Sequence, residues 1–420
     1  MNPTRRHFLL GSAALGALGL PLTSARAVPG NQRKLVIVYA PGGWDITRVF
    51  APEFSNRAVA MEAAAERATA GGISYVSHPG RPNVDAFFAN HHRDALVVNG
   101  MMVRSIAHEI CTMITMTGTS SGLAPDWPAI VADTDRTGYT LPHLVLSGPS
   151  FPGDKGVAVA RTGLAGQLEA LVSGEVDAWS ATSYDAPDRV REAVIDRYLQ
   201  RRATARAMGT LADADARQAQ AFADSATKLG DLKGLRYGIS FTSSLLLQDQ
   251  ARVAADALSQ GVSRCVTMSY AGAQGQGWDT HANNDDLQSP LWDELFGGLL
   301  QLMVELRSTP GTSAATLADE TLVVVMSEMG RTPNINGTNG KDHWPYTSAM
   351  LIGPGVTGDR VVGGFDDTFY GKAVDPASGE VGNGAPVLSA ESLGATLLSY
   401  CDIDPGPFVS GVTPLTGVLA

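Results

Sequence analysis

The sequence has few cysteines, and it has fewer basic than acidic side chains. Its three cysteines, Cys111, Cys265 and Cys401, show no CxxC spacing, which argues against a disulfide framework and against a zinc knuckle. We expect all three thiols to be buried as small apolar groups. The chain carries 31 Lys and Arg against 42 Asp and Glu, a formal net charge of -11. Because binding to a phosphate backbone needs clustered cations, we expect no nucleic acid partner.

The sequence also lacks a strongly apolar run of the roughly 20 residues that a membrane span requires. A milder apolar stretch, residues 8–22, follows Arg5 and Arg6 and precedes Ala25-Arg26-Ala27. This order of basic, apolar and small residues is typical of a cleavable export signal. We interpret residues 1–27 as a twin-arginine signal peptide; an ordinary secretory signal and a retained anchor are the alternatives. We expect a periplasmic or secreted protein with no stable membrane span after signal cleavage.

Short apolar runs alternate with helical patterns along the rest of the chain. The runs, each typical of a buried strand, cover residues 35–39, 96–98, 144–146, 266–270 and 322–326. Apolar residues recur at helical spacing over residues 244–257, 286–306 and 390–401. The pattern predicts an α/β fold, a doubly wound and mainly parallel sheet with helices on both faces. In such a fold, functional groups lie at the carboxyl ends of the strands.

The chain from residue 28 to residue 420 is interpreted as one large domain. Residues 186–233 depart from the alternating pattern, because they are rich in Ala, Arg and Asp and contain no strand run. We interpret this stretch as a helical insertion, whose alternating charges are typical of a solvated helix face. Residues 353–386 are rich in Gly and Asp and indicate loops.

Carboxylates and imidazoles follow several of the predicted strands. The candidates are Asp45, Asp279 with His281, Glu328 with Arg331, and Asp342 with His343. If the strand ends meet at one edge, these side chains suit a divalent metal such as Zn²⁺ or Mn²⁺.

Each candidate taken alone has a simpler explanation. Asp45 could cap a following helix, and His281 and His343 could be structural residues held by hydrogen bonds. Glu328 and Arg331 could pair with each other. The metal site is indicated by the whole set of candidates rather than by any one of them.

Two motifs within this set resemble a known family. The segments GWDTH at residues 277–281 and SEMGRTP at residues 327–333 resemble the bacterial DUF1501 family, as do residues 38–45, residues 108–118 and Asp342-His343. Its members are exported proteins related to the alkaline phosphatase and sulfatase superfamily. The resemblance implies an alkaline-phosphatase-like fold and a phosphate or sulfate ester as substrate.

The resemblance also implies roles for individual residues. Asp45 matches the metal-binding Asp after the first strand, Asp279 and His281 match an Asp and His that share one metal, and His343 matches the final metal-binding His. The later strand of the superfamily ends in Asp-His-Gly, whereas here the carboxylate of Glu328 is followed by Met329. The metal position that includes Asp45 and Glu328 is therefore expected to be the weaker of two.

His108 occupies the place of the superfamily's nucleophile, nine residues before Thr117-Gly118. Relatives have a Cys, Ser or Thr there, and an imidazole is not the hydroxyl or thiol that attacks an ester. His108 could bind metal, act as a general base, or form a phosphoryl-imidazole. Thr112 and Thr115 lie nearby, as does Ser120, but the spacing favours none of them.

Two functions stay open. The first is an exported metal-dependent hydrolase of phosphate or sulfate esters, with one metal held by Asp279, His281 and His343. In this hypothesis, His108 is catalytic and Arg331 holds an anionic oxygen of the substrate. The second is a non-catalytic exported module with a degenerate site, which binds a polysaccharide, a lipid head group or a partner protein.

Overall fold

The computed structural model describes residues 28–163, 167–173, 189–209, 212–235, 238–239, 241, 244–272, 277–382 and 384–420. The predicted signal peptide, residues 1–27, lies outside the described residues. Within this part of the chain, no helix is both long enough and apolar enough to cross a membrane.

The centre of the molecule is an eight-stranded sheet with the order β12-β4-β11-β8-β1-β7-β5-β6. The strands are β1 (Lys34–Tyr39), β4 (Ala95–Met102), β5 (His143–Val145), β6 (Val159–Arg161), β7 (Cys265–Ser269), β8 (Thr321–Met326), β11 (Tyr346–Ile352) and β12 (Arg360–Gly363). Every pairing is parallel except the two that β11 makes, with β4 and β8. The predicted α/β fold with a mainly parallel sheet is therefore confirmed, and the five predicted runs lie in or overlap β1, β4, β5, β7 and β8.

Strand β11 was not predicted, although all seven of its residues are buried. It begins with Tyr346, Thr347 and Ser348, so its sequence is not a continuous apolar run. Strand β12 lies within the stretch that was expected to be loops. Both strands are recognisable only through the neighbours with which they pair.

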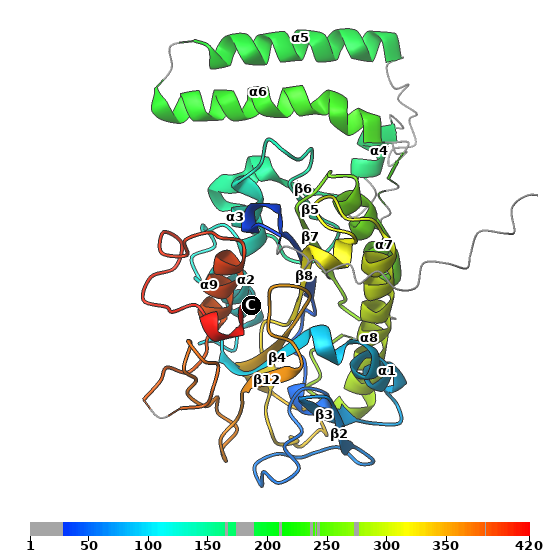
Figure 1. Cartoon of the computed structure of the whole chain (residues 1–420), viewed down its shortest axis with the longest axis vertical. Helices are drawn as coiled ribbons and strands as arrows, with labels where there is room; N and C mark the ends of the chain where they lie inside the picture. The colour runs from blue at the N-terminus through cyan, green and yellow to red at the C-terminus, as the bar shows by residue number, and fades with distance from the viewer. Residues whose placement is uncertain are drawn as a thin grey trace, which may run out of the picture.

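Helices cover both faces of the sheet (Figure 1). One face carries α1 (Pro82–His91), α7 (Leu247–Ser259) and α8 (Asn284–Ser308), and the other carries α2 (His108–Thr117), α3 (Trp127–Asp133) and α9 (Ala390–Tyr400). Because successive side chains of a strand point to opposite faces, β1 contributes to both cores. Val36 and Val38 pack on the α7 and α8 side, and Leu35, Ile37 and Tyr39 on the α9 side. The predicted helices at residues 244–257, 286–306 and 390–401 correspond to α7, α8 and α9.

Two small sheets and several short helices complete the body of the molecule. The sheets are β2 (Glu66–Ala70) with β3 (Ile73–Ser77), and β9 (Gly330–Arg331) with β10 (His343–Trp344), both antiparallel. The short helices are α4 (Gln167–Ser173) and the 3₁₀ turns η1 (Gly30–Gln32), η2 (Ile46–Arg48), η3 (His92–Asp94), η4 (Gly153–Ala158), η6 (Leu317–Asp319) and η7 (Thr416–Val418).

Two long helices, α5 (Arg189–Ala207) and α6 (Asp213–Gly234), lie side by side beyond one end of the sheet (Figure 1). They fall in the stretch expected to be a helical insertion. The Lys228 ammonium of α6 donates hydrogen bonds to the carbonyls of Arg136 and Tyr139, which ties α6 to the body of the molecule. The limits of the domain itself stay a prediction.

The three cysteines are buried and free, as expected. Burial raises the pKa of the Cys111 thiol and of the Cys401 thiol to about 11. All three therefore act as small apolar side chains of the core.

Candidate metal centre

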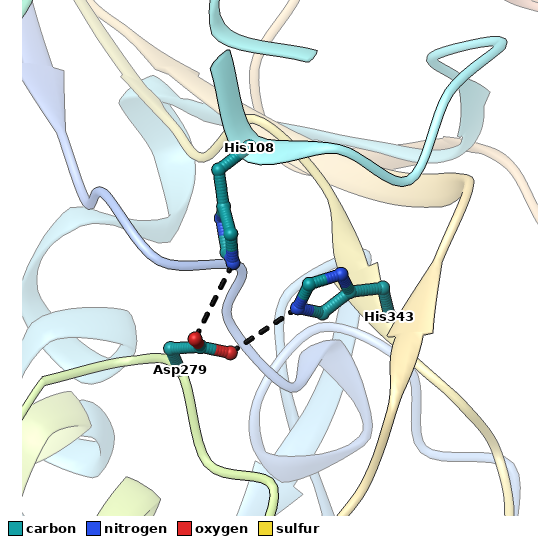
Figure 2. A group of neighbouring side chains, drawn as sticks. All are labelled: His108, Asp279 and His343. Carbon is teal, nitrogen blue, oxygen red and sulfur yellow. Dashed lines mark hydrogen bonds and ion pairs between the residues drawn. The ribbon is translucent and has the colours of Figure 1, made fainter. Parts of the chain in front are cut away.

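Four strands end at the same edge of the sheet and lead to the candidate residues. Strand β1 leads to the Gly42-Gly43 turn, β4 to the start of α2 at His108, β7 to the loop that carries Asp279, and β8 to Glu328. His343 comes from β10, which pairs with β9 so that His343 lies opposite Arg331. Figure 2 shows the His108, Asp279 and His343 side chains pointing toward one another.

Buried tryptophans hold the Asp279 loop in place. Trp278 is fully buried beside Asp279, and its indole N–H donates a 2.9 Å hydrogen bond to the Tyr270 carbonyl. Its ring packs edge-on against Trp292 at 5.1 Å, and Trp292 in turn stacks on Trp44 at 4.8 Å. Such aromatic pairs have preferred geometries and bury large apolar areas. The Trp of the GWDTH motif is thus an anchor, and the Asp after it is presented at the sheet edge.

The Gly42-Gly43 turn packs closely against this loop. Gly42 has φ +120, and a Cβ on it would lie 3.0 Å from both the Asp279 nitrogen and Trp278 Cβ. The glycine therefore permits both the backbone conformation and the approach of the two loops.

One ligand atom each of His108, Asp279 and His343 lies within 4.8 Å of the other two. The Asp279 carboxylate is central, with Oδ1 3.2 Å from His343 Nε2 and Oδ2 3.5 Å from His108 Nε2. His281 lies at the outer side of this group. Its Nε2 is 3.1 Å from Asp279 Oδ1 and 3.0 Å from His343 Nε2. Three imidazole Nε2 atoms thus surround one carboxylate.

The other ring nitrogen of each histidine faces an oxygen acceptor. Nδ1 of His108 is 2.8 Å from Glu328 Oε1, Nδ1 of His343 is 2.7 Å from the Ile106 carbonyl oxygen, and Nδ1 of His281 is 3.0 Å from Asp342 Oδ1. Only a protonated Nδ1 can donate to these oxygens, so the Nε2 lone pairs of neutral rings point to the centre. Metal-binding histidines typically have this arrangement.

The same atoms test whether a metal fits. His108 Nε2 is buried and has no hydrogen-bond partner, and such an orphaned acceptor is costly unless something occupies its lone pair. The Nε2 atoms of His281 and His343, 3.0 Å apart, also repel each other if both carry lone pairs. Imidazole nitrogens with one carboxylate are the ligands that Zn²⁺ prefers, and Mn²⁺ accepts them. The residues therefore fit a divalent metal.

Arg331 lies behind Asp279 rather than in open space. It is fully buried, and its guanidinium donates to the carbonyls of Gly43 at 2.7 Å, Lys341 at 3.1 Å and Gly42. It also donates to Asp279 Oδ1 at 2.6 Å. Burial alone raises the pKa of Asp279, but the hydrogen bond and charge of Arg331 outweigh it and lower that pKa to about 2. Arg331 thus keeps Asp279 ionised, and four of its N–H groups donate to protein oxygens.

Glu328 lies behind His108 in the same way, with 1% of the residue exposed. Its Oε1 accepts hydrogen bonds from the Gly42 N–H at 2.7 Å and from His108, and its Oε2 accepts from the Ser327 hydroxyl at 3.0 Å. The hydrogen bond to Glu328 raises the pKa of His108, and burial of the ring opposes this shift. The contacts of Glu328 are with His108 and the glycine turn, whereas Arg331 pairs with Asp279.

The Asp45 carboxylate is held by groups other than the three histidines. It is fully buried, accepts from the Thr47 N–H at 3.1 Å at the start of η2, and pairs with Lys341 at 2.8 Å and with Arg48 at 3.3 Å. It also accepts from the Asn284 amide at 2.8 Å. Burial raises the pKa of Asp45, but the two cations outweigh it and lower that pKa well below its usual range. This is the capping role that was the simpler explanation, and Asp45 is not part of the group formed by His108, Asp279 and His343.

An open pocket of about 550 Å³ lies over His108, Asp279 and Glu328. Its other lining residues are Pro41, Gly42, Glu109, Thr112, Met113 and Phe151. The Thr112 hydroxyl donates to the His108 carbonyl at 2.8 Å within helix α2. Sequence reasoning named Thr112 but none of Glu109, Met113 and Phe151 as parts of a site, because nothing in their own segments marks them. The Ile106 carbonyl behind His343 was also missed, since any residue can supply a carbonyl.

The fold and the site define an α/β protein with a histidine and aspartate cluster at the carboxyl edge of its sheet. The family model "Protein of unknown function (DUF1501)" matches residues 34–404, so the chain belongs to this family. The resemblance drawn from the two motifs is therefore confirmed.

A search of curated protein sequences found no match. Among solved structures, Ps i-CgsB in complex with k-i-k-neocarrahexaose is similar with TM-score 0.41 and 11% identity, over 90% of this chain and 74% of that one. The PsFucS1 sulfatase from Pseudoalteromonas sp. is similar with TM-score 0.40 and 8% identity, over 92% and 72% of the two chains. The phosphonate monoester hydrolase SpPMH from Silicibacter pomeroyi has TM-score 0.39 and 11% identity, over 91% and 77%. Likenesses of this size say nothing about what this chain binds or does.

Proposed function

We propose that this protein is an exported hydrolase that cleaves a phosphate or sulfate ester with one divalent metal, Zn²⁺ or Mn²⁺. The observation that carries the proposal is the convergence of imidazole Nε2 atoms on Asp279, each ring being held through Nδ1 by an oxygen acceptor. His108, Asp279 and His343 are the proposed ligands.

In this proposal, His108 is a ligand and not a nucleophile. Its Nδ1 is occupied by Glu328, and its Nε2 points at Asp279 from 3.5 Å. The Thr112 hydroxyl, an alternative nucleophile on the same helix that lines the pocket, is engaged with the His108 carbonyl. A divalent metal bound there would supply Lewis acidity, which makes a water molecule acidic enough to attack near neutral pH. The attacking group is therefore water.

His281 is proposed as the general base. It is the most exposed of the three imidazoles, with 48% of its side chain accessible against 30% for His108 and 20% for His343. Its Nε2 can accept the proton of the water, and Asp342, 3.0 Å from Nδ1, stabilises the imidazolium that forms. The same proton can then pass to the oxygen of the departing alcohol. Arg331 acts as a positioning residue that holds Asp279.

A second candidate function follows from the same residue. The Nε2 of His281 lies as close to Asp279 Oδ1, at 3.1 Å, as that of His343 does at 3.2 Å. If His281 is a fourth ligand, the site has a closed tetrahedral set, which is typical of structural zinc. The protein would then be an exported binding module, with a polysaccharide or lipid head group as ligand.

Two variants separate these functions. In the hydrolase, His343→Ala should lose both bound metal and activity, whereas His281→Gln should keep the metal and lose about 10²- to 10⁴-fold in rate. The measurements are metal content by mass spectrometry and hydrolysis of aryl phosphate and sulfate esters by the mature protein. His92→Gln, on η3 and paired with Asp359, is the matched control and should change neither. Loss of metal from His281→Gln, together with a wild type that cleaves no ester, would support the binding module instead.

A further inference from the structure

The pocket over the metal centre carries negative charge on the protein side. Three carboxylates line it, those of Glu109, Asp279 and Glu328, and the lining contains no Lys or Arg from the described part of the chain. Such a lining contrasts with the cationic clamps that stabilise doubly charged phosphates.

Two buried cations of the neighbouring segments, Arg331 and Lys341, are engaged by other protein atoms. Arg331 is fully buried, and its guanidinium is held by three backbone carbonyls and by Asp279. Lys341 is also fully buried, and its ammonium binds Asp45 at 2.8 Å and the Thr47 hydroxyl at 2.9 Å. Neither side chain is available to a bound ester without breaking buried ion pairs.

The charges near the centre can be added. One divalent metal, with a charge of about +2, and the Arg331 guanidinium, which donates to Asp279 Oδ1 at 2.6 Å, together balance Asp279, Glu328 and Glu109. The centre therefore has no excess positive charge to hold a doubly charged group, and Glu109 lies at the pocket wall. A second negative charge on the substrate would add repulsion at close range, where charges interact strongly. The pocket therefore favours an ester that carries only one.

The remaining wall of the pocket suits an apolar group. Pro41, Met113 and Phe151 contribute apolar surface, and the volume of about 550 Å³ is in the range of small-molecule sites. An aryl or alkyl alcohol part could lie against these side chains while the ester group faces Asp279.

We propose that the pocket selects singly charged esters of apolar alcohols, that is sulfate monoesters and phosphate diesters, over doubly charged phosphate monoesters. This inference rests on the proposed function, because it places the ester at the same centre. Glu109, which lies in the first turn of α2 and is exposed, is the residue that sets the charge preference.

Binding of anions that contain no ester bond tests the preference without turnover. Phenylphosphonate, at a pH where it is doubly ionised, and the singly charged methyl(phenyl)phosphinate have the same aryl group, and neither has a P–O–C bond to cleave. Calorimetry on the zinc-loaded protein should show the phosphinate binding at least about tenfold more tightly, a difference of about 1.4 kcal/mol. Glu109→Lys should reduce this ratio about tenfold. Asp215→Lys on α6 makes the same charge change on an exposed residue outside the pocket lining, and it should leave the ratio unchanged.

Three other results would each contradict the preference for singly charged esters. Phenylphosphonate binding as tightly as methyl(phenyl)phosphinate, an unchanged ratio in Glu109→Lys, or binding of neither anion would each do so. Failure of the proposed function has a different signature. The protein would bind the phosphinate selectively but would cleave neither p-nitrophenyl sulfate nor bis(p-nitrophenyl) phosphate. Faster cleavage of p-nitrophenyl phosphate would instead leave the hydrolase standing and remove the charge preference.

Discussion

Replacing Glu328 by Gln tests whether His108 is a metal ligand. The carboxylate is buried, and its Oε1 accepts both from the Gly42 N–H at 2.7 Å and from His108 Nδ1 at 2.8 Å. The amide oxygen of Gln can take both hydrogen bonds, while its NH₂ group can donate to the Ser327 hydroxyl oxygen. The fold should therefore survive, and the variant should lose mainly the negative charge behind the His108 ring.

The magnitude follows from that charge. A carboxylate behind a metal-binding histidine makes the ring a stronger ligand, and its removal typically weakens metal binding about 10- to 100-fold. Because Gln keeps the hydrogen bond to His108, we expect Glu328→Gln to weaken zinc binding by the lower end of this range, about tenfold or about 1.4 kcal/mol. Glu328→Leu removes the hydrogen-bond acceptor as well, and it should weaken zinc binding about 100-fold.

Competition with a chromophoric zinc chelator measures these affinities. Glu320→Gln is the matched control, because Glu320 is another buried carboxylate, next to the opposite end of β8, where it pairs with Lys34 at 3.0 Å. That variant should lower the melting temperature without changing zinc affinity. Equal zinc affinity in wild type, Glu328→Gln and Glu328→Leu would refute the assignment of His108 as a ligand held by Glu328.

Three further predictions concern other parts of the chain. Lys341→Met should lower the free energy of unfolding by about 3 kcal/mol, because it leaves Asp45 buried with only one cation. Denaturant unfolding measures this free energy, and an unchanged value would contradict a stabilising Lys341–Asp45 ion pair. Burial lowers the pKa of His91 to about 4, so the native ring stays neutral while the unfolded chain binds a proton below about pH 6.5. The free energy of unfolding should therefore decrease as the pH is lowered from about 6.5 to about 4. The melting temperature of His91→Gln should decrease less over this range. An equal decrease in the variant would mean that groups other than His91 cause the loss of stability. Replacing Arg5 and Arg6 by Lys should hold the precursor in the cytoplasm if export uses the twin-arginine route; unchanged export on fractionation would indicate the general secretory route.

Much of the fold was predictable because the signals are local. A continuous apolar run such as residues 35–39 is typical of a strand buried on both faces, and the 3.6-residue period of residues 286–306 is typical of a helix covering it. Strand β11 escaped prediction because its burial comes from pairing with β4 and β8, while its first three residues are polar or amphipathic.

The sequence by itself determined the alternation of five strands with the helices between them, the family, and the kinds of ligand that stand after the strand ends. These follow from residue types and spacing along the chain. Only the tertiary structure decided which candidates meet, because the partner of a side chain depends on the approach of distant segments. Asp45 meets Lys341, whereas Asp279 meets His108 and His343. Exposure is decided in the same way, so the buried guanidinium of Arg331 supports Asp279 from behind, and the Nε2 atoms of three imidazoles surround the Asp279 carboxylate.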